Sequence, residues 1–346
     1  MSQIILEYYE TLKNKVSFDI VTHSLFEEQY KNRVSENSKI FILPSRKKKT
    51  LKYISRLRTI IKQESYDIIH IHGNSALMSI ELKAIRKFTN AKIIVHCHGS
   101  QSNYGKLERL LRSYFYKNYD KAITVELDES YLFKGKPHEK ILNGINLKNY
   151  EFQEINKDII ANEFDIKNHT VLLHVGRFNE GKNHKFLIKV FQEYLLIERT
   201  AKLFLVGDGP LKNDLIAEVK KLGLSKAIVF VGEYSQVEKW YSASDVFLFP
   251  SLHEAFGLVA IEAQANGLPC VFSTSVPRQV KVNENVEFCG ISDEDVKEWL
   301  TQIHKFSKLR KNKLTSKINP EINKYDIKSS SNRLLNIYHE LIYDKG

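Results

Sequence analysis

The sequence is poor in cysteine and has no long apolar run. Its three cysteines are widely spaced and form no C-x-x-C pair, which argues against a disulfide framework and against a cysteine-rich metal site. No apolar run reaches the roughly 18 residues that a membrane-spanning helix requires. The first ten residues have neither the basic start nor the apolar block of a secretion signal. We therefore expect a cytoplasmic protein, and its 346 residues suffice for two domains.

What the chain does have is a positive charge confined to its first half. The formal net charge is +11, and residues 1–150 hold 26 basic and 15 acidic residues, whereas residues 151–346 hold 26 of each. The densest basic segment, residues 46–62, contains eight basic residues and no acidic one. Four apolar residues recur in it at helical spacing, namely Leu51, Ile54, Leu57 and Ile61. This pattern predicts a helix with one buried face and one basic face.

The basic face of residues 46–62 has two interpretations. It is either an ordinary solvated surface or a docking site for anionic lipid headgroups or a phosphate-bearing substrate. A second basic stretch, rich in aromatic residues, follows at 106–121. No nucleic-acid-binding motif accompanies the charge, so we do not expect a nucleic acid as partner.

Short apolar, β-branched segments alternate with stretches of helical periodicity along the chain. The predicted strands are residues 17–22, 39–43, 67–72, 92–97, 122–125, 171–175, 202–206, 228–231, 246–249 and 269–273. Helical periodicity lies between most of them, as at 185–198 and 212–222. The alternation predicts an α/β fold with parallel sheets covered by helices on both faces. The polar segment 151–170 divides the strands into two sets, so we expect two Rossmann-like domains with a ligand cleft between them.

A loop with a phosphate-binding pattern follows the predicted strand 171–175. Its sequence over residues 176–183, Gly-Arg-Phe-Asn-Glu-Gly-Lys-Asn, differs from G-x-x-x-x-G-K-[ST] only in the last residue and thus lacks the hydroxyl that binds Mg²⁺. Arg177 and Lys182 are expected at the carboxyl end of the strand, where a guanidinium and an ammonium together suit a diphosphate. The alternative is that both are ordinary surface cations on a turn.

A second candidate anion site follows the predicted strand 246–249. A short loop carries Glu254, and a helix is expected to begin near Phe256. Amides at a helix N-terminus bind anions, and Gly257 would let a phosphate approach the backbone closely. Glu262 would lie on nearly the same side as Glu254 if the helix is regular. Because carboxylates repel phosphate, both glutamates are better suited to sugar and ribose hydroxyls.

These segments together resemble the retaining glycosyltransferases of family 4. Five blocks carry the resemblance: Asn143-Gly144-Ile145-Asn146, Gly176-Arg177…Lys182-Asn183, Gly207-Asp208-Gly209-Pro210, Tyr241-x-x-Ser244-Asp245, and Glu254-Ala-Phe-Gly-Leu with Glu262 eight residues after Glu254. The likeness runs from about residue 17 to the end of the chain and is strongest over 171–273. It implies the GT-B fold, with an acceptor-side domain at residues 1–150 and a nucleotide-sugar-binding domain at 151–328. A C-terminal helix within 329–346 would pack back on the first domain.

The resemblance also implies roles for individual residues. Arg177 and Lys182 would stabilise the diphosphate of a sugar nucleotide in place of a divalent metal, with help from amides near Phe256, Gly257 and Leu258. Glu254 would bind hydroxyls of the donor sugar, Glu262 the ribose, and the backbone around Val231 and Gly232 the base. His98 matches a histidine that lies near the donor sugar in the family. The acceptor hydroxyl would attack from the face of the leaving group, so that the departing phosphate takes its proton.

The histidines admit a different interpretation. His70 and His72 alternate along one predicted strand, and His96 and His98 along another, so each pair shares a face. Four imidazoles could form the metal site of a metallohydrolase. No H-E-x-x-H helix or carboxylate cluster accompanies them, and we expect no resident metal or cofactor.

The chain departs from the family at its start. Members usually begin with a strand and a glycine-rich turn before the helix that residues 4–12 resemble, and neither has a counterpart here. Loss of that central strand should leave unpaired backbone groups and exposed apolar surface. Three explanations stay open: the natural start lies upstream, the domain is rearranged, or the chain is impaired.

We therefore expect an enzyme that moves a sugar from a nucleotide-diphosphate donor, most readily a UDP-sugar, to a saccharide hydroxyl. The resemblance implies capsule or exopolysaccharide synthesis on a lipid-diphosphate-linked acceptor, with residues 46–62 docked peripherally on the anionic inner face of the cell membrane. The alternatives are a catalytically impaired sugar-nucleotide-binding subunit, or another GT-B enzyme such as a sugar-nucleotide epimerase.

Overall fold

The computed structural model divides the chain into two compact units. It describes residues 2–22, 32–98, 105–125, 132–233, 236–254, 256–311 and 318–343. Unit 1 comprises Met1–Ile145 and Lys324–Gly346, and unit 2 comprises Asn146–Asn323. The predicted boundaries at residues 150 and 328 each lie five residues from these divisions.

Unit 2 is built on one parallel sheet. The strands follow the order β12-β11-β10-β7-β8-β9 across it. Their bounds are β7 Val171–Val175, β8 Lys202–Val206, β9 Ile228–Gly232, β10 Val246–Phe249, β11 Cys270–Ser273 and β12 Val286–Cys289. The helices of this unit are α6 Leu147–Tyr150, α7 Glu154–Glu163, α8 His184–Tyr194, α9 Lys212–Lys221, α10 Val237–Ala243, α11 Leu258–Ala265 and α12 Val296–Lys311, with short 3₁₀ turns η3 Glu180–Lys182 and η4 Arg278–Val280.

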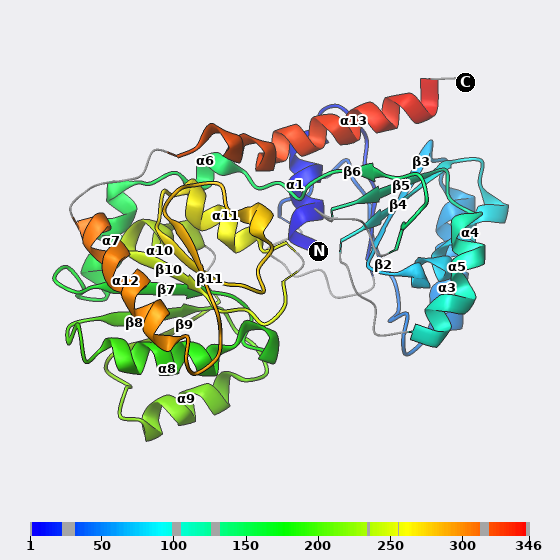
Figure 1. The fold of residues 1–346 in the computed structure, drawn as a ribbon. Coiled ribbons are helices and arrows are strands. Elements are labelled where there is room, and N and C mark those ends of the chain that lie inside the picture. The colour runs from blue at the N-terminus through cyan, green and yellow to red at the C-terminus, as the bar shows by residue number, and fades with distance from the viewer. Residues whose placement is uncertain are drawn as a thin grey trace. The chain divides into compact units, whose positions relative to one another are not determined.

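Helices cover both faces of this sheet, as the alternation predicts. Residues of α8, α9 and α12 form one apolar cluster with every second strand residue, such as Leu203 and Leu205. On the other face Phe204 and Phe247 meet aromatic side chains of α10. Figure 1 shows α8 and α9 on one side of the sheet and α10 and α11 on the other. Because both faces are buried, the central strands are continuous apolar runs.

Unit 1 contains two separate parallel sheets. One pairs β1 Ile20–Thr22 with β2 Ile40–Ile42, and the other has the order β3-β4-β5-β6. The strands of the second sheet are β3 Ile68–Gly73, β4 Lys92–Cys97, β5 Lys121–Thr124 and β6 Glu139–Lys140. The helices are α1 Ser2–Leu12, α3 Thr50–Gln63, α4 Ser79–Ile85, α5 Gly105–Tyr116 and α13 Ile327–Tyr343, with 3₁₀ turns η1 Ala76–Met78 and η2 Arg86–Phe88; a further turn, η5 Pro320–Tyr325, spans the division from unit 2. Within the described ranges, no pairing joins β1 to β3.

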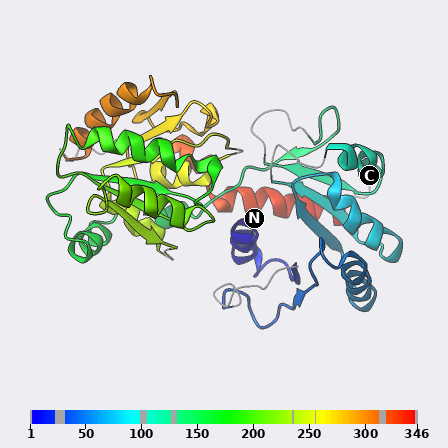
Figure 2. The ribbon, with the colours of Figure 1, turned by 90° about the horizontal axis from the view of Figure 1, so that it is seen from below.

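The two faces of the four-stranded sheet pack against different helices. Ile93 and Val95 of β4 belong to the cluster that contains side chains of α3 and α4, whereas Ile94 belongs to the cluster of α1 and α13. Figure 2 shows α13, in red, beside α1, in dark blue, and the two helices are in contact. Unit 1 is thus a three-layer arrangement of helices, sheet and helices.

The last segment of the chain is built into unit 1 by backbone contacts. The N–H of Ile145 donates to the carbonyl of Tyr325 (2.9 Å), and the N–H of Ile327 donates to the carbonyl of Ile145 (2.9 Å). A Cβ on Gly144 would lie 2.6 Å from the Cα of Ile327, so this position has room only for glycine. The Asn143–Asn146 block therefore joins the two chain segments of unit 1.

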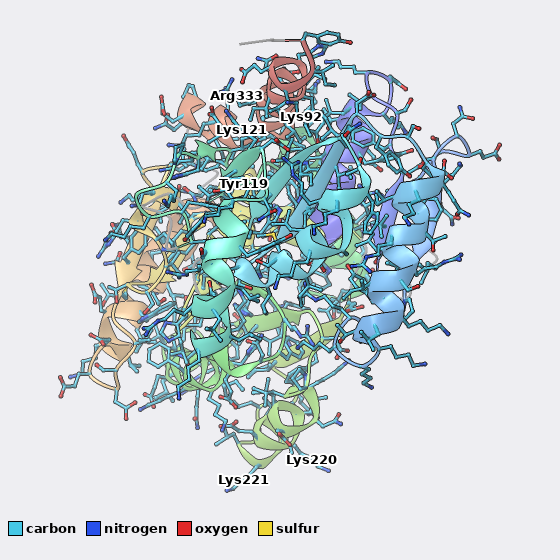
Figure 3. The ribbon with its side chains drawn as sticks, turned by 90° about the vertical axis from the view of Figure 1, so that its right-hand side faces the viewer. Lys92, Tyr119, Lys121, Lys220, Lys221 and Arg333 are labelled. Atoms are coloured by element: carbon cyan, nitrogen blue, oxygen red, sulfur yellow. The ribbon has the colours of Figure 1, made fainter. Side chains whose placement is uncertain are left out.

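An ion-pair group at the surface also links α13 to this sheet. Glu139 of β6 accepts from Lys121 of β5 (3.1 Å) and from Arg333 of α13 (2.9 Å). Lys121 and Arg333 are labelled in Figure 3. Since these side chains are partly exposed, the contribution of each pair is modest.

Most of the predicted elements are confirmed. The strand list was incomplete, and the start and the buried face of the basic helix differ from the prediction. All ten predicted strand positions hold strands, but β6 and β12, both edge strands, were not predicted. The basic segment is helical only from Thr50. Its buried face comprises Tyr53, Leu57, Ile60 and Ile61, whereas Leu51 is 84% exposed because it lies in the first turn, away from that face. Among the described helices, none is both long and apolar enough to span a membrane.

Candidate active site

The loop Gly176–Asn183 leaves the central strand β7 of unit 2 and packs on a second glycine-containing loop. The N–H of Phe178 donates to the carbonyl of Asp208 (2.9 Å), and the N–H of Gly176 donates to that of Val206 (3.0 Å). A Cβ on Gly209 would lie 2.4 Å from the carbonyl oxygen of Phe178. The glycines after β8 therefore allow two backbones to touch, and this contact fixes the loop that carries Arg177 and Lys182.

Lys182 and Glu254 meet in an ion pair. The Nζ of Lys182 lies 2.5 Å from Oε2 of Glu254, and both side chains are less than a fifth exposed. The ammonium also lies 4.7 Å from the ring centroid of Phe249. A backbone bond from the N–H of Leu252 to the carbonyl of Gly181 (2.8 Å) ties the two loops together. Two residues predicted for the site, 72 positions apart, are thus brought into direct contact.

Arg177 lies on the same loop with its side chain exposed. Within the described part of the chain, it forms no ion pair. An exposed guanidinium without an ion-pair partner can bind an anion without first losing a contact, so Arg177 is suited to binding a ligand.

The start of α11 has the form expected for an anion site. Gly257 precedes the helix in the left-handed conformation (φ +81°), and no side chain caps the end. Phe256 is buried, and Leu258 is the first helical residue. The first amides of a helix have no intrahelical acceptor, so this end offers donors and the positive end of the dipole.

The structure confirms that Glu254 lies in a short loop and that Glu262 lies in the helix that follows it. The helix begins at Leu258, and Glu254 lies in the preceding loop because Gly257 turns the backbone out of helical geometry. Glu262 lies within the helix, where its Oε2 accepts a 2.7 Å bond from the hydroxyl of Tyr241. Burial, and then the charge of Glu262, hold the pKa of Tyr241 well above its usual value, so this tyrosine stays a donor that orients the carboxylate.

Gly232 ends β9, next to the loop that follows β8. It has φ +83°, and its carbonyl accepts from the N–H of Gly207 (2.8 Å). Nothing lies within 4 Å of a Cβ built on it, so the backbone there is open. Val231 precedes it and is half-buried.

Two histidines close to Lys182 were not predicted to belong to the site. His174 of β7 and His184 at the start of α8 stack edge to face, with centroids 4.8 Å apart. Burial, followed by the charge of Lys182, lowers the pKa of His184 to about 4, and burial lowers that of His174 well below its usual value. Both are neutral at pH 7 and add no positive charge to the loop. The signal in the sequence was weak, since a single histidine in a strand, such as His174, or at the start of a helix, such as His184, is usually a core residue.

His98 belongs to unit 1 and follows β4. Its Nε2 lies 2.8 Å from Nδ1 of His72, a hydrogen bond between two imidazoles. Desolvation is the main cause that lowers the pKa of His98 to about 4. His98 is therefore a neutral side chain at pH 7, able to donate or accept one hydrogen bond.

The two histidines of β3, His96 of β4 and His98 just after it form one stack, and each alternating pair shares a face as predicted. His70 stacks on His72 (4.1 Å between centroids), and His96 stacks on His98 (4.2 Å). One ring nitrogen each from His70, His72 and His96 lies within 4.8 Å of the other two, a set that could hold a metal ion. The Nδ1 of His70 also lies 2.8 Å from the hydroxyl of Tyr338. The metal interpretation thus has a candidate ligand set, although stacked rings do not aim their nitrogens at one point as a tetrahedral site would.

Comparison with known families decides the identity of both units. Residues 156–322 match the family described as "Glycosyl transferases group 1". Residues 2–147 match the family described as "Glycosyltransferase Family 4". The chain is a glycosyltransferase. Its two family domains correspond closely to units 2 and 1, so the resemblance found in the motifs is confirmed.

Relatives and solved structures agree with this assignment. The glycosyltransferase is 27% identical over 302 residues to the putative glycosyltransferase EpsF of Bacillus subtilis, covering 80% of this chain and 76% of that protein. It is 25% identical over 374 residues to a UDP-Gal:alpha-D-GlcNAc-diphosphoundecaprenol alpha-1,3-galactosyltransferase of Escherichia coli, covering 100% and 95%. The Anabaena protein HepE in complex with UDP-glucose superposes with a TM-score of 0.80 at 15% identity, covering 97% and 94%.

These likenesses confirm the predicted GT-B fold, with two parallel-sheet α/β domains. They also confirm the coarse activity, the transfer of a glycosyl group. The roles of the individual site residues stay predictions.

Proposed function

We propose that this glycosyltransferase transfers a sugar, with retention of configuration, from a nucleotide diphosphate donor to a hydroxyl of a lipid-diphosphate-linked saccharide in capsule or exopolysaccharide synthesis. A UDP-sugar is the favoured donor. The observation that carries the proposal is the Lys182–Glu254 contact, because it joins the loop after β7 to the loop before α11 at the carboxyl ends of neighbouring parallel strands. Ligands of open α/β sheets bind at such ends.

The geometry suggests how the donor would be held. Lys182 is paired with Glu254 in the free protein, and a diphosphate would compete for that ammonium. When the diphosphate takes Lys182, Glu254 is released and can accept hydrogen bonds from hydroxyls of the donor sugar. Arg177 and the first amides of α11, at Phe256, Gly257 and Leu258, add charge and donors to the same anion.

The nucleoside would be held farther along the unit. Glu262, oriented by Tyr241, would accept hydrogen bonds from the ribose hydroxyls. The open backbone at Gly232 would lie against the base. Two fixed cations would stabilise the leaving diphosphate as charge develops, so we propose that transfer needs no divalent metal and no cofactor. The role of His98 near the donor sugar stays a prediction carried by the family resemblance.

Nucleotide-dependent thermal stabilisation tests the donor site. UDP, GDP, ADP and CMP are added to the full chain with and without EDTA, and at about 100 times its dissociation constant a nucleotide should add roughly 2.7 kcal/mol to the stability of unit 2. We expect a response to UDP that EDTA does not change and that Glu262→Ala or Lys182→Ala removes. Lys185→Ala, which removes an exposed lysine three residues along the chain, is the matched control. A UDP response that survives both site variants would contradict the proposed donor site.

A non-catalytic sugar-nucleotide-binding subunit is the second candidate. The observation that favours it is the interruption between the two sheets of unit 1, the unit that the resemblance assigns to the acceptor. UDP-dependent stabilisation without any release of UDP from a UDP-sugar in the presence of lipid-linked acceptors would support this candidate over the enzyme.

Unit 1 supplies the basic surface of the proposed membrane contact. Lys48, Lys49, Lys52 and Arg56 are exposed, and so is the apolar side chain of Leu51 between them. On α5, Leu107 and Leu110 are 49% and 79% exposed among basic residues. Both α3 and α5 contact α4. Exposed leucines among lysines are typical of a surface that lies at a lipid interface.

Binding to vesicles tests this contact. Replacing Lys47, Lys48, Lys49 and Lys52 by glutamate should abolish sedimentation with vesicles that contain phosphatidylglycerol. The matched control replaces Lys185, Lys220, Lys221 and Lys226 of unit 2, all exposed, by glutamate; Lys220 and Lys221 are labelled in Figure 3. Equal binding of the two variants would contradict membrane docking through α3.

A further inference from the structure

His174 of β7 is a fully buried imidazole, and one of its nitrogens has no hydrogen-bond partner among the described residues. Its Nδ1 lies 2.8 Å from the carbonyl oxygen of Leu248 on the neighbouring strand β10. Because a carbonyl oxygen can only accept, Nδ1 carries the proton of the neutral ring, and Nε2 is left as an acceptor. A buried acceptor without a partner is costly and rare, so we expect this nitrogen to have a role.

The unpartnered nitrogen of His174 lies next to the loop that carries Lys182. A Cβ built on Gly176 would lie 3.2 Å from Nε2 of His174 and 3.5 Å from both Cδ and Cε of Lys182. The imidazole nitrogen and the lysine stem therefore both border the space that a side chain at position 176 would fill. Because residue 176 is a glycine, that space is open, and the Lys182 ammonium can reach Nε2 by a change of rotamer at the end of its stem.

In the free protein, Glu254 orients Lys182. The ammonium lies 2.5 Å from Oε2 of Glu254 and over the ring of Phe249. A carboxylate that accepts from an ammonium orients it, but it also cancels most of its charge. When Glu254 turns to the hydroxyls of the donor sugar, as proposed above, Lys182 regains its charge and loses the hydrogen bond that orients it. Because the lysine stem is long and flexible, the ammonium then needs another acceptor to stay in place.

We propose that His174 is a positioning residue for Lys182 in the donor-bound state, in which Nε2 of the imidazole accepts one of the ammonium protons. This inference rests on the proposed donor site. Another N–H of the ammonium is then directed at the diphosphate, while Glu254 binds the sugar. A neutral imidazole accepts a hydrogen bond without bringing a negative charge, so the full charge of Lys182 acts on the leaving diphosphate. Donor binding thus exchanges a charged partner of Lys182 for a neutral one.

Burial keeps His174 in the form that this role requires. It is the main cause that holds the pKa of His174 well below its usual value, so the ring carries no positive charge that would repel Lys182. His184 packs edge to face against this ring, with centroids 4.8 Å apart, and its nitrogens also lack partners among the described residues. The three atoms nearest to a Cβ on Gly176, however, belong to His174 and Lys182, so we assign the role to His174.

Two substitutions separate the two nitrogens of His174. His174→Asn keeps an amide N–H at the position of Nδ1, where it can donate to Leu248, and removes the acceptor at Nε2. His174→Gln is longer and places its amide group at the position of Nε2 instead. In isothermal titration calorimetry of the full chain, we expect His174→Asn to weaken UDP binding about tenfold or more, and His174→Gln to stay within about threefold of the original affinity. His169→Asn and His169→Gln, just before the start of β7, are the matched controls.

Gly176→Ala tests the same contact without changing either partner. Its methyl group would occupy the space that borders both Nε2 of His174 and the stem of Lys182. We expect it to weaken UDP binding about as much as His174→Asn does. This variant also keeps the proposal testable if His174→Gln does not fold.

Urea unfolding distinguishes positioning from a purely structural role of His174. Both tryptophans are buried in unit 2, so their fluorescence reports the stability of that unit. His174→Asn should be the more stable of the two variants, because it keeps the hydrogen bond to Leu248. UDP affinity should follow the opposite order, with His174→Gln binding more tightly. A purely structural role predicts the same order for stability and affinity.

Three results would overturn the proposal, and they separate it from the proposed donor site. If Lys182→Ala abolishes UDP binding while His174→Asn and Gly176→Ala leave it unchanged, the donor site stands and only the role of His174 fails. UDP affinity that follows the stability of the variants would likewise reduce His174 to a structural residue. If the original chain binds neither UDP nor pyrophosphate, the donor site itself fails, and this inference fails with it.

Discussion

The two units share one architecture, and the sheets differ in how well their strands are buried. The residues of β10 and β11 in unit 2 are all buried, whereas all six residues of β3 in unit 1 are only partly so. Yet half of the residues of β3, which has the sequence Ile-Ile-His-Ile-His-Gly, are isoleucine, so its exposure does not follow from a polar sequence. The difference lies in the neighbours. β10 has a paired strand on each side, whereas β3 has one on one side only within the part of the chain that the structure describes. Burial of a strand is thus a property of the completed sheet rather than of its own sequence.

The largest effect is expected at Gly209, where two loops of unit 2 touch. In Gly209→Ala the new Cβ would lie 2.4 Å and 2.7 Å from the backbone O and N of Phe178, so the Lys182 loop must move. We expect a loss of about 3 kcal/mol in the stability of unit 2, together with loss of the UDP response. Tryptophan fluorescence in urea measures this loss, since both tryptophans are buried in unit 2.

Gly105→Ala in unit 1 is the matched control for Gly209→Ala. Nothing lies within 4 Å of a Cβ at Gly105, which begins α5. The substitution should change stability by no more than about 1 kcal/mol, and in the favourable direction, since alanine is the better helix former. Equal losses in the two variants would mean that the contact between the loops of unit 2 is looser than its geometry indicates.

Acid should weaken unit 1 through its histidine stack. His98 has a pKa of about 4 in the folded chain against about 6.5 unfolded, so between these values the unfolded state binds more protons and stability falls as pH falls. At pH 5 this costs on the order of 2 kcal/mol relative to pH 7 for His98. Burial also holds the pKa of His96 well below its usual value, so the same sign applies to it.

His96→Leu removes one histidine from the stack while keeping an apolar side chain in a fully buried place. The loss of stability of unit 1 between pH 7 and pH 5 should become smaller by roughly 2 kcal/mol, measured by urea unfolding followed by circular dichroism. His339→Gln, at an exposed position of the same unit, is the control. An unchanged pH dependence in His96→Leu would show that His96 is already charged or solvated in the folded state.

The smallest effect is expected at the surface of unit 1. Arg333 bridges Glu139 and Glu340 at 2.9 Å and 3.1 Å, but its side chain is 41% exposed. Arg333→Ala should cost less than about 1 kcal/mol, and less still in 1 M salt. A loss of 2 kcal/mol or more would indicate that charge rather than apolar packing holds α13 on unit 1.

Sequence patterns predicted the elements better than the contacts between them. The central strands of unit 2 are apolar on both faces, so each forms a continuous apolar run that can be recognised in the sequence. The unpredicted strands β6 and β12 lie at sheet edges, and β6 is only Glu139–Lys140, whose polar sequence carries no strand signal. The apolar character of Leu51 suggested burial, but Leu51 lies in the first turn of α3, away from the face that holds Tyr53, Leu57 and Ile60.

The candidate site shows the same limit. Motifs identified Lys182, Glu254 and Glu262 as separate residues with separate ligands. The ion pair between Lys182 and Glu254 and the bond from Tyr241 to Glu262 depend on which strands are neighbours in the sheet, which spacing alone does not fix. The left-handed conformation of Gly257 was not predicted either, because glycine permits a positive φ but does not require it.

The junction of Ile145 with Tyr325 and Ile327 has a consequence for the order of events during synthesis. Unit 1 is made from both ends of the chain, and all of Asn146–Asn323 is translated between them. At 5–20 residues per second, translation of unit 2 takes roughly 10 to 40 s, so the first segment of unit 1 waits that long before α13 is made. During that interval Tyr8, Ile94 and Ile123 lack the apolar cover that α13 supplies. The second domain to be translated is therefore the first that can be complete, and the nascent first domain is the part of this protein that a chaperone would meet.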